Sequence, residues 1–279
     1  MRAFAVVFCA VSLVVLGDTA GKLLTSSGTA PGFVGWTRFA LAALLLVPFI
    51  GPRGAEWRSL LDWRLWARGA TIAAGIACIL TALRTAPIAD VFGAFFIGPI
   101  ISYALSVLCL GERVTAARTA LLLAGFAGVL MVVRPGLGAP EGIGWALLAG
   151  VSYGTYLALT RWLAGAWRPG VMLSSQLIAG AVLLAPLGLA APPAATDARL
   201  AGLVLASALG SAAGNYLLVR VSRTVPASIV APLVYTQLIS ATLAGVLVFG
   251  DWPDPLALAG LAVILASGLL SLALVSWGR

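Results

Sequence analysis

Ten apolar segments separated by short turns dominate this chain. A helix needs about 20 apolar residues to cross a bilayer, and within the hydrocarbon only helices and closed barrels satisfy their backbone polar groups. The sequence therefore predicts an all-α integral membrane protein with ten transmembrane helices. The expected spans are residues 3–24, 30–50, 67–84, 87–110, 114–133, 141–163, 170–190, 198–220, 226–249 and 255–276.

Composition supports this fold class and excludes several functions. Charged residues make up 9% of the chain, against about 25% in a typical soluble domain. There is no histidine, which removes His-based acid–base catalysis, haem ligation by His and most zinc sites. The three cysteines lie far apart in apolar runs, without disulfide or metal-binding spacing. We expect neither a cofactor nor an enzyme activity.

The chain contains an internal duplication. When residues 84–112 are compared with the residues 139 positions further on, 8 of the 29 positions are identical. The same offset places Lys22 on Arg161. We therefore expect two copies of a five-helix unit, residues 1–136 and 137–279. Five is an odd number, so the second unit would be inverted, which is the architecture of a secondary transporter with its site between the halves.

The basic residues predict an orientation. With the N-terminus in the cytoplasm, twelve Lys and Arg residues lie on the cytoplasmic side and four on the other, while Arg38 falls inside the second span. Short cytoplasmic loops carry an excess of Lys and Arg. Both termini are therefore expected on the cytoplasmic side of the inner membrane. This pattern also accounts for the net charge of +8, so no nucleic-acid partner is expected.

Several short motifs extend over most of the chain. The fourth segment begins Pro-Ile-Ala-Asp at 87–90 and ends Gly-Glu-Arg at 111–113; its copy begins Pro-Ala-Ser at 226–228, and Arg-Pro-Gly follows the fifth segment at 134–136. In this order and spacing they resemble the drug/metabolite transporter superfamily, specifically its EamA-type branch. The second copy departs from the pattern, because Asp251 and a tryptophan replace the Glu-Arg pair.

The resemblance implies a central cavity lined by helices of both halves, with the fourth and ninth helices at its centre. It leaves the substrate open, because relatives move amino acids, nucleotide derivatives, vitamins and drugs in either direction. The partners it implies are a small-molecule substrate and the lipid bilayer. A monomer and a homodimer are both compatible with it.

Three charged residues inside spans are candidates for substrate binding or coupling. A charge in a span costs on the order of 3 kcal/mol unless it is paired or hydrated. Asp18 lies one helical turn before Lys22, so both are on one face of the first span; the structural alternative is that Lys22 extends to the membrane interface and Asp18 only pairs with it. Arg38 could pair with Asp18 or Asp90, or hold a carboxylate or phosphate of the substrate. Asp90 could also simply cap its helix. Proton coupling, if present, would use Asp18 and Asp90.

Aromatic and amide side chains are further candidates for the cavity. Phe95, Phe96 and Tyr103 form a stripe on the fourth segment, and Tyr153 and Tyr156 form one on the sixth. Such stripes are commonly packing, but Phe96 aligns with Tyr235 in the duplication. Aromatic rings with a few directed polar groups suit an amphipathic solute. The remaining candidates, which could also hydrogen-bond between helices, are Asn215, Tyr235 and Gln237.

The function that these features favour is a secondary transporter in the cytoplasmic membrane. The preferred substrates are amino acids or related amphipathic metabolites, moved outward by alternating access. Uptake of a vitamin or a nucleoside-like compound is the close alternative, and a carrier of lipid-linked substrates is another. A purely structural membrane subunit is disfavoured, because its intramembrane charges would be costly without a purpose.

Overall fold

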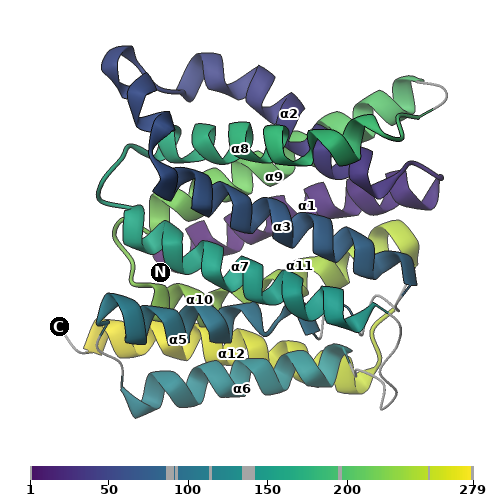
Figure 1. Ribbon diagram of the computed structural model, residues 1–279. Helices are drawn as coiled ribbons and strands as arrows, with labels where there is room; N and C mark the ends of the chain where they lie inside the picture. Colours follow the sequence, from purple (N-terminus) through teal and green to yellow (C-terminus); the bar gives the residue numbers. More distant parts are fainter. Residues whose placement is uncertain are drawn as a thin grey trace.

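The computed structural model describes residues 2–85, 91, 94–112, 115–133, 142–193, 197–250 and 252–277. Every regular element in these residues is helical (Figure 1). The elements are α1 (Arg2–Ser26), α2 (Pro31–Ile50), the 3₁₀-helix η1 (Gly54–Leu61), α3 (Trp63–Thr85), α5 (Gly98–Leu110), α6 (Ala116–Val133), α7 (Ile143–Leu163), α8 (Pro169–Leu189), α9 (Ala198–Val221), α10 (Ala227–Val234), α11 (Gln237–Ala244), the π-turn η2 (Gly245–Phe249) and α12 (Pro255–Trp277).

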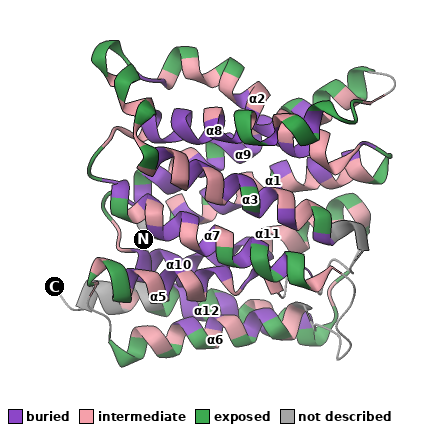
Figure 2. Ribbon diagram, viewed as in Figure 1, coloured by how far each residue is buried: buried purple, intermediate pink, exposed green. Residues whose placement is uncertain are grey.

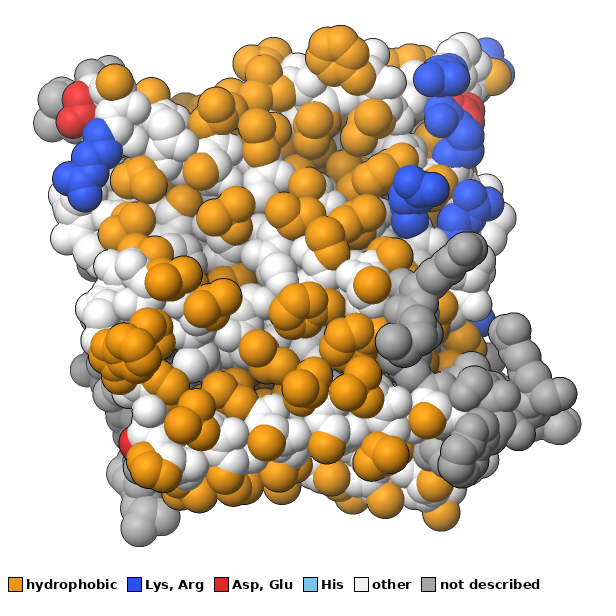
Figure 3. All heavy atoms as spheres, turned by 180° about the vertical axis from the view of Figure 1, so that it is seen from behind, with side chains coloured by type: hydrophobic (Ala, Val, Ile, Leu, Met, Phe, Trp, Pro, Cys, Tyr) orange, Lys and Arg blue, Asp and Glu red, His pale blue; other side chains and the backbone are white. Residues whose placement is uncertain are grey.

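The prediction of a helical membrane protein is confirmed. Among the described residues, 7 helical stretches are long and apolar enough to cross a membrane, and three shorter apolar helices lie at 98–110, 116–132 and 255–270. Each of these overlaps one of the predicted segments. Hydrophobic side chains cover the middle of the surface in Figure 3, whereas Lys and Arg gather near its lateral edges, as expected for a multi-pass membrane protein.

Two of the predicted spans are interrupted near their middle. The fourth breaks at Phe96 and Ile97, directly before α5, and the ninth breaks at Tyr235 and Thr236, between α10 and α11. At the first break, Pro99 has no N–H to continue the hydrogen-bond ladder. At the second, the Thr236 hydroxyl donates to the Leu233 carbonyl at 2.6 Å. The two breaks are 139 residues apart, the offset of the duplication.

Helices from the two halves of the chain interleave. The largest packing contacts are those of α1 with α9, α2 with α8, α3 with α7 and α6 with α12. In addition, α5 packs on α7 and α11 packs on α1, while α10 packs on α5. Buried residues concentrate along these contacts and exposed ones face outward (Figure 2). The interior is therefore made jointly by both halves, so a site between them draws residues from each.

Glycine permits the closest of these contacts. A Cβ placed on Gly128 of α6 would lie 2.8 Å from the Gly260 carbonyl of α12, and one on Gly260 would lie 2.6 Å from the Gly128 carbonyl. Both distances are too short for any side chain. The α6–α12 pair therefore associates through backbone contact, which is the usual role of small residues between membrane helices.

The two ends of the bundle are distinguishable. The first turn of α1 and the last turns of α12 lie at the same end in Figure 1, together with the end of α5 and the start of α10. We call this the N end. The opposite end, where α1 finishes and α2 begins, is the far end.

Candidate binding cavity and gate

A cavity of about 420 Å³ opens between the two halves toward the far end. This volume lies within the range of pockets that hold small organic molecules, about 300–1,000 Å³. Its walls come from α1, α2, α3, the break before α5, α6, α11, η2 and the start of α12 with the residues before it. The apolar walls include Ile76, Leu80, Phe96, Leu238, Phe249 and Trp252; the polar and charged groups include Asp18, Thr19, Lys22, Thr25, Arg38 and Gln237.

Arg38 is a charged cavity residue that is fixed by three hydrogen-bond partners. Its Nη1 lies 2.7 Å from the Asp18 carboxylate, its Nη2 donates to the Gly17 carbonyl at 2.9 Å, and its Nε donates to the Ser207 hydroxyl at 3.2 Å. Three helices, α1, α2 and α9, thus fix one guanidinium. The Arg38 side chain is 7% exposed and that of Asp18 is 36% exposed. Asp18 is therefore the partner that a solute in the cavity can reach.

Lys22 supplies a second positive charge. Its ammonium nitrogen lies 3.9 Å from the centre of the Phe249 ring, a distance suited to a cation–π contact. Because Lys22 is one turn after Asp18 on α1, both side chains face the same cavity. Of the two partners considered for Arg38, the structure shows the pair with Asp18. Asp90 itself lies outside the described residues.

The two helix breaks carry residues of both halves to the cavity. Phe96, at the first break, lines the cavity, as does Gln237, the first residue of α11 after the second break. The Phe96 ring meets the Tyr235 ring edge-on, with centroids 6.0 Å apart. Tyr235 thus lies behind Phe96, fully buried. An interrupted helix frees backbone groups at membrane depth, where transporters commonly place their sites.

The other predicted site residues lie away from this cavity. Phe95 packs on Tyr153 with ring centroids 5.2 Å apart, and both are buried. The Tyr103 hydroxyl is 2.6 Å from the Thr119 hydroxyl. Tyr156 and Asn215 belong to a separate polar cluster. Of the predicted residues, Asp18, Arg38, Phe96 and Gln237 therefore share the cavity; roles in binding for all of them stay predictions.

A buried polar cluster occupies the space between α3, α7, α8 and α9. The Arg68 guanidinium, 0% exposed, donates to the Thr160 hydroxyl at 2.8 Å and to the Gln176 side-chain oxygen at 2.9 Å. The Tyr156 hydroxyl donates to the same Gln176 oxygen at 2.9 Å and is 3.0 Å from the Asn215 side-chain oxygen. Arg68 is one of the twelve basic residues that the sequence places on the cytoplasmic side, so this cluster was not predicted from the sequence.

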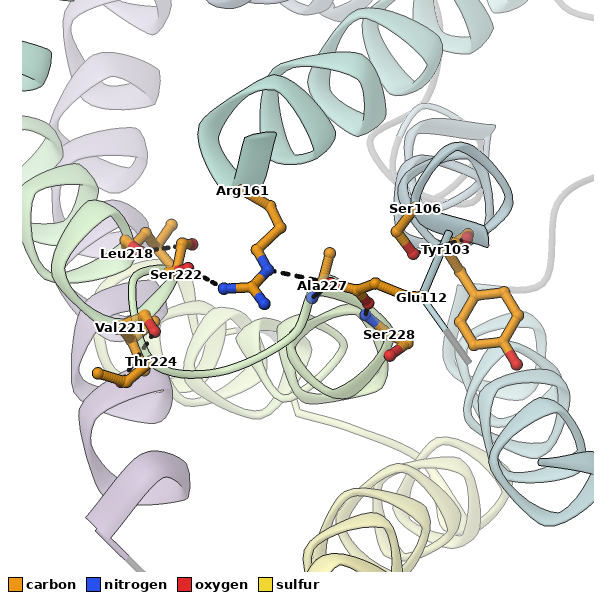
Figure 4. Close-up of polar contacts among 10 residues, drawn as sticks. All are labelled: Tyr103, Ser106, Glu112, Arg161, Leu218, Val221, Ser222, Thr224, Ala227 and Ser228. Carbon is orange, nitrogen blue, oxygen red and sulfur yellow. Dashed lines mark hydrogen bonds and ion pairs between the residues drawn. The ribbon is translucent and has the colours of Figure 1, made fainter. Parts of the chain in front are cut away.

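A carboxylate closes the N end of the bundle (Figure 4). Glu112, just after α5, lies 3.0 Å from Arg161 Nε at the end of α7. It also accepts hydrogen bonds from the backbone amides of Ala227 at 3.1 Å and Ser228 at 3.0 Å, in the first turn of α10. Arg161 in turn donates to the Ser222 carbonyl at 2.9 Å. These residues, the gate cluster, tie α5 of the first half to α7 and α10 of the second.

The gate cluster sets the protonation of Glu112. Partial burial by itself raises the pKa of this carboxyl, but the amides of Ser228 and Ala227 and the Arg161 guanidinium outweigh burial, so its pKa lies below the ordinary value. Each of these donors favours the charged form. The carboxylate is thus ionised at neutral pH and complements the positive N-terminal end of the α10 helix.

The architecture and the cavity between the halves define a membrane transporter, and comparison with known proteins agrees. Residues 140–273 match the model of the EamA-like transporter family. The chain is 30% identical over 237 residues to a protein named riboflavin transporter from Rhizobium johnstonii, covering 83% of this chain and 78% of that protein. A solved crystal structure of a protein superposes with a TM-score of 0.79 at 20% identity, covering 98% of this chain and 99% of the other. The chain belongs to the EamA-like transporter family.

Proposed function

We propose that this protein is a secondary transporter that works by alternating access between two inverted repeats, residues 1–136 and 137–279, in the cytoplasmic membrane. The observation that carries the proposal is a cavity open at one end of the bundle combined with a closed gate cluster at the other. In the part of the chain that the structure describes, the cavity opens toward the far end, so a solute would enter from that end. Release on the other side requires the gate cluster to part.

The helix packing supports the inverted repeats. In the proposed repeats, the counterparts of α1, α2, α3 and α5 are α7, α8, α9 and α11. Exchanging counterparts converts the α1–α9 contact into α7–α3, the α5–α7 contact into α11–α1, and the α3–α8 contact into α9–α2. All six contacts occur. The coincident helix breaks at Phe96 and Tyr235 support the same relation. Two near-equivalent halves supply two near-equivalent conformations, one open to each side.

The basic residues assign the sides of the membrane in this proposal. The N end carries Arg168, which lies 2.7 Å from Glu56 through its Nε, as well as Arg64 beside Asp62 and Arg161. By the positive-inside rule this end faces the cytoplasm, with both termini there. The structure then corresponds to an outward-facing state, and the cavity receives its solute from outside.

The substrate we propose is a vitamin with a planar aromatic ring, of the riboflavin class, taken up into the cell. Phe96, Phe249 and Trp252 offer ring faces and edges in the cavity, while Gln237 and the Asp18–Arg38 pair offer hydrogen bonds at its inner end. Flat heteroaromatic solutes need both kinds of contact. The relative named riboflavin transporter supports this class.

Amino acids form the second candidate class, because one observation favours them. Asp18 and Lys22 place opposite charges one helical turn apart on the same wall. A zwitterion presents an ammonium and a carboxylate at a matching short separation, and charge-assisted hydrogen bonds would hold both.

The experiment that separates the classes is counterflow in liposomes that hold the purified protein. Liposomes are loaded with unlabelled riboflavin or with unlabelled amino acids, and labelled tracer of each is added outside. We expect the riboflavin tracer to accumulate only in riboflavin-loaded vesicles. Accumulation of amino-acid tracer instead selects the second class, and a folded protein that exchanges neither class overturns the metabolite proposal in favour of a carrier of lipid-linked substrates.

A further inference from the structure

We propose that the buried cluster around Arg68 is the second binding face of the transporter, which the substrate contacts after the N end opens. The proposal rests on the alternating-access function above. It assigns Tyr156, Gln176 and Asn215 as contact groups, with Arg68 holding them in place and supplying a positive potential.

The cluster is more polar than helix packing requires. Arg68 is completely buried, and no carboxylate lies within ion-pair distance of it in the part of the chain that the structure describes. A buried cation without a counter-ion is costly. Hydrogen bonds to Thr160, Gln176 and the Met172 carbonyl offset that cost in this state. An anionic or acceptor-rich solute would offset it better.

The cluster repeats the polar pattern of the cavity through the duplication. Gln176 lies 138 positions after Arg38, and Tyr156 lies 139 positions after Gly17, at the offset that also relates Lys22 to Arg161. Correspondingly, Arg38 donates to the Gly17 carbonyl at 2.9 Å, and Gln176 accepts from the Tyr156 hydroxyl at 2.9 Å. The second half thus holds a buried polar contact at the place that corresponds to the Arg38–Gly17 contact beside the open cavity.

The correspondence extends to the third helix of each half. Arg68 lies 139 positions before Ser207, and Gln176 is the counterpart of Arg38. The hydrogen bond from Arg38 to Ser207 therefore corresponds to the hydrogen bond from Arg68 to Gln176, with donor and acceptor exchanged. Asn215 likewise lies 139 positions after Ile76, which lines the cavity. If the two halves exchange conformations, the groups now facing the far end become buried, and the Arg68 cluster becomes the lining of a cavity open to the N end.

The chemistry of the cluster indicates the kind of solute group it would hold. Gln176 and Asn215 carry amide donors and acceptors, and Tyr156 carries a hydroxyl. Such groups recognise ring carbonyls, ring nitrogens and hydroxyls, or a carboxylate that approaches Arg68. The outward cavity instead offers an accessible carboxylate, Asp18. The two faces therefore differ in charge, which gives the cycle an asymmetry between loading and release.

Thiol labelling tests whether the cluster becomes accessible. Cys9, Cys78 and Cys109 are replaced by alanine, and Asn215→Cys is introduced. A membrane-impermeant thiol reagent is then applied to each side of reconstituted vesicles separately. The control is Ala212→Cys, which lies on the same helix at 2% exposure, against 5% for Asn215. We expect labelling of Asn215→Cys from the N-end side alone, at a rate limited by an inward-open population of about 0.1–10%, and no labelling of the control.

Adding Glu112→Gln, which weakens the gate cluster, should speed labelling of Asn215→Cys and leave the control unlabelled. Absence of labelling from the N-end side in both backgrounds overturns the inference, because a purely structural cluster stays closed. Labelling does not depend on the substrate. If the parent protein exchanges neither riboflavin nor amino acids, the proposed substrates fail while the labelling result still decides the second face.

A kinetic variant supplies an independent readout. In a transporting preparation, Gln176→Ala should raise the KM for solute presented at the N end more than the KM for solute presented at the far end, because Gln176 does not line the outward cavity. Equal changes at both sides, or a change in protein stability alone, contradict the assignment.

Discussion

The carboxylate of Glu112 and the guanidinium of Arg161 lie 3.0 Å apart and belong to opposite halves of the chain. Glu112 is also bonded to the first amides of α10, so a single side chain holds three helices together at the N end. Opening this end requires those contacts to break together. The state of Glu112 should therefore control which side of the membrane the cavity faces.

Replacing Glu112 with glutamine should release the N end. The amide keeps the size of the side chain but loses charge-assisted hydrogen bonds, which contribute about 1.5–3 kcal/mol each at most. With Cys9 and Cys78 replaced by alanine, spin labels on Cys109, which is exposed, and on Arg223→Cys report the separation of α5 from the start of α10. We expect a longer-distance population to increase by about tenfold, which corresponds to roughly 1.4 kcal/mol.

The matched control for that variant is Glu56→Gln. Glu56 also pairs with an arginine at the N end, Arg168, but it connects η1 to α8 and leaves α5 and α10 untouched. Its distance distribution should match that of the unmodified chain. An increase of the same size in both variants would show that general loss of charge at this end, rather than the Glu112 contacts, opens it.

The gate cluster should also respond to pH. The pKa of Glu112 is lowered in the closed state, so its contacts are fully present above the ordinary pKa of a glutamate and are lost as pH falls through the lowered value. We expect the spin-label distance to stay constant from neutral pH down to about pH 4.5 and to lengthen below it. In Glu112→Gln this step should be missing. A step at the same pH in that variant would assign the titration to another group.

Much of the fold follows from the sequence alone. The apolar segments could be inferred because they depend on segment length. The cost of a charge inside a span also predicted a partner for Arg38, with Asp18 as one of two candidate residues. Because Phe96 aligns with Tyr235 in the duplication, the sequence also predicted that an aromatic residue of this pair lines the cavity, and Phe96 does so. Both lie at the helix breaks, and a proline in the pattern marked the first of them.

The remaining site could not be predicted, because it depends on which helices meet. Arg68 lies close to the start of its helix, so its position resembles that of an ordinary flanking charge; only the packing of α3 against α7 and α8 buries it. Tyr103 shares a stripe with Phe96, yet it faces Thr119 on α6. Residues of a stripe share one face only while the helix is continuous. Phe96 lies at the break before α5 and Tyr103 lies within α5, so the two rings have different neighbours.

Arg38 should be needed as an arginine and not only as a positive charge. Its fork reaches Asp18, the Gly17 carbonyl and Ser207 at once, and a lysine ammonium cannot span all three. Loss of one or two such bonds, about 1.5–3 kcal/mol each, should raise the KM from the far end about tenfold or more in Arg38→Lys. The measurement is initial uptake into vesicles. Arg220→Lys, an exposed position at the end of α9, should leave the KM unchanged.

Arg68 should be essential for stability. Removing its side chain in Arg68→Ala leaves a cavity and deprives Thr160 and Gln176 of their buried donor, so the unfolding free energy should fall by about 3 kcal/mol. The comparison is Arg64→Ala, one turn earlier on α3, whose partly exposed pair with Asp62 is expected to contribute little. Thermal unfolding of both variants in detergent measures the difference. Equal midpoints would mean that the buried cluster gives α3 no more stability than a surface ion pair does.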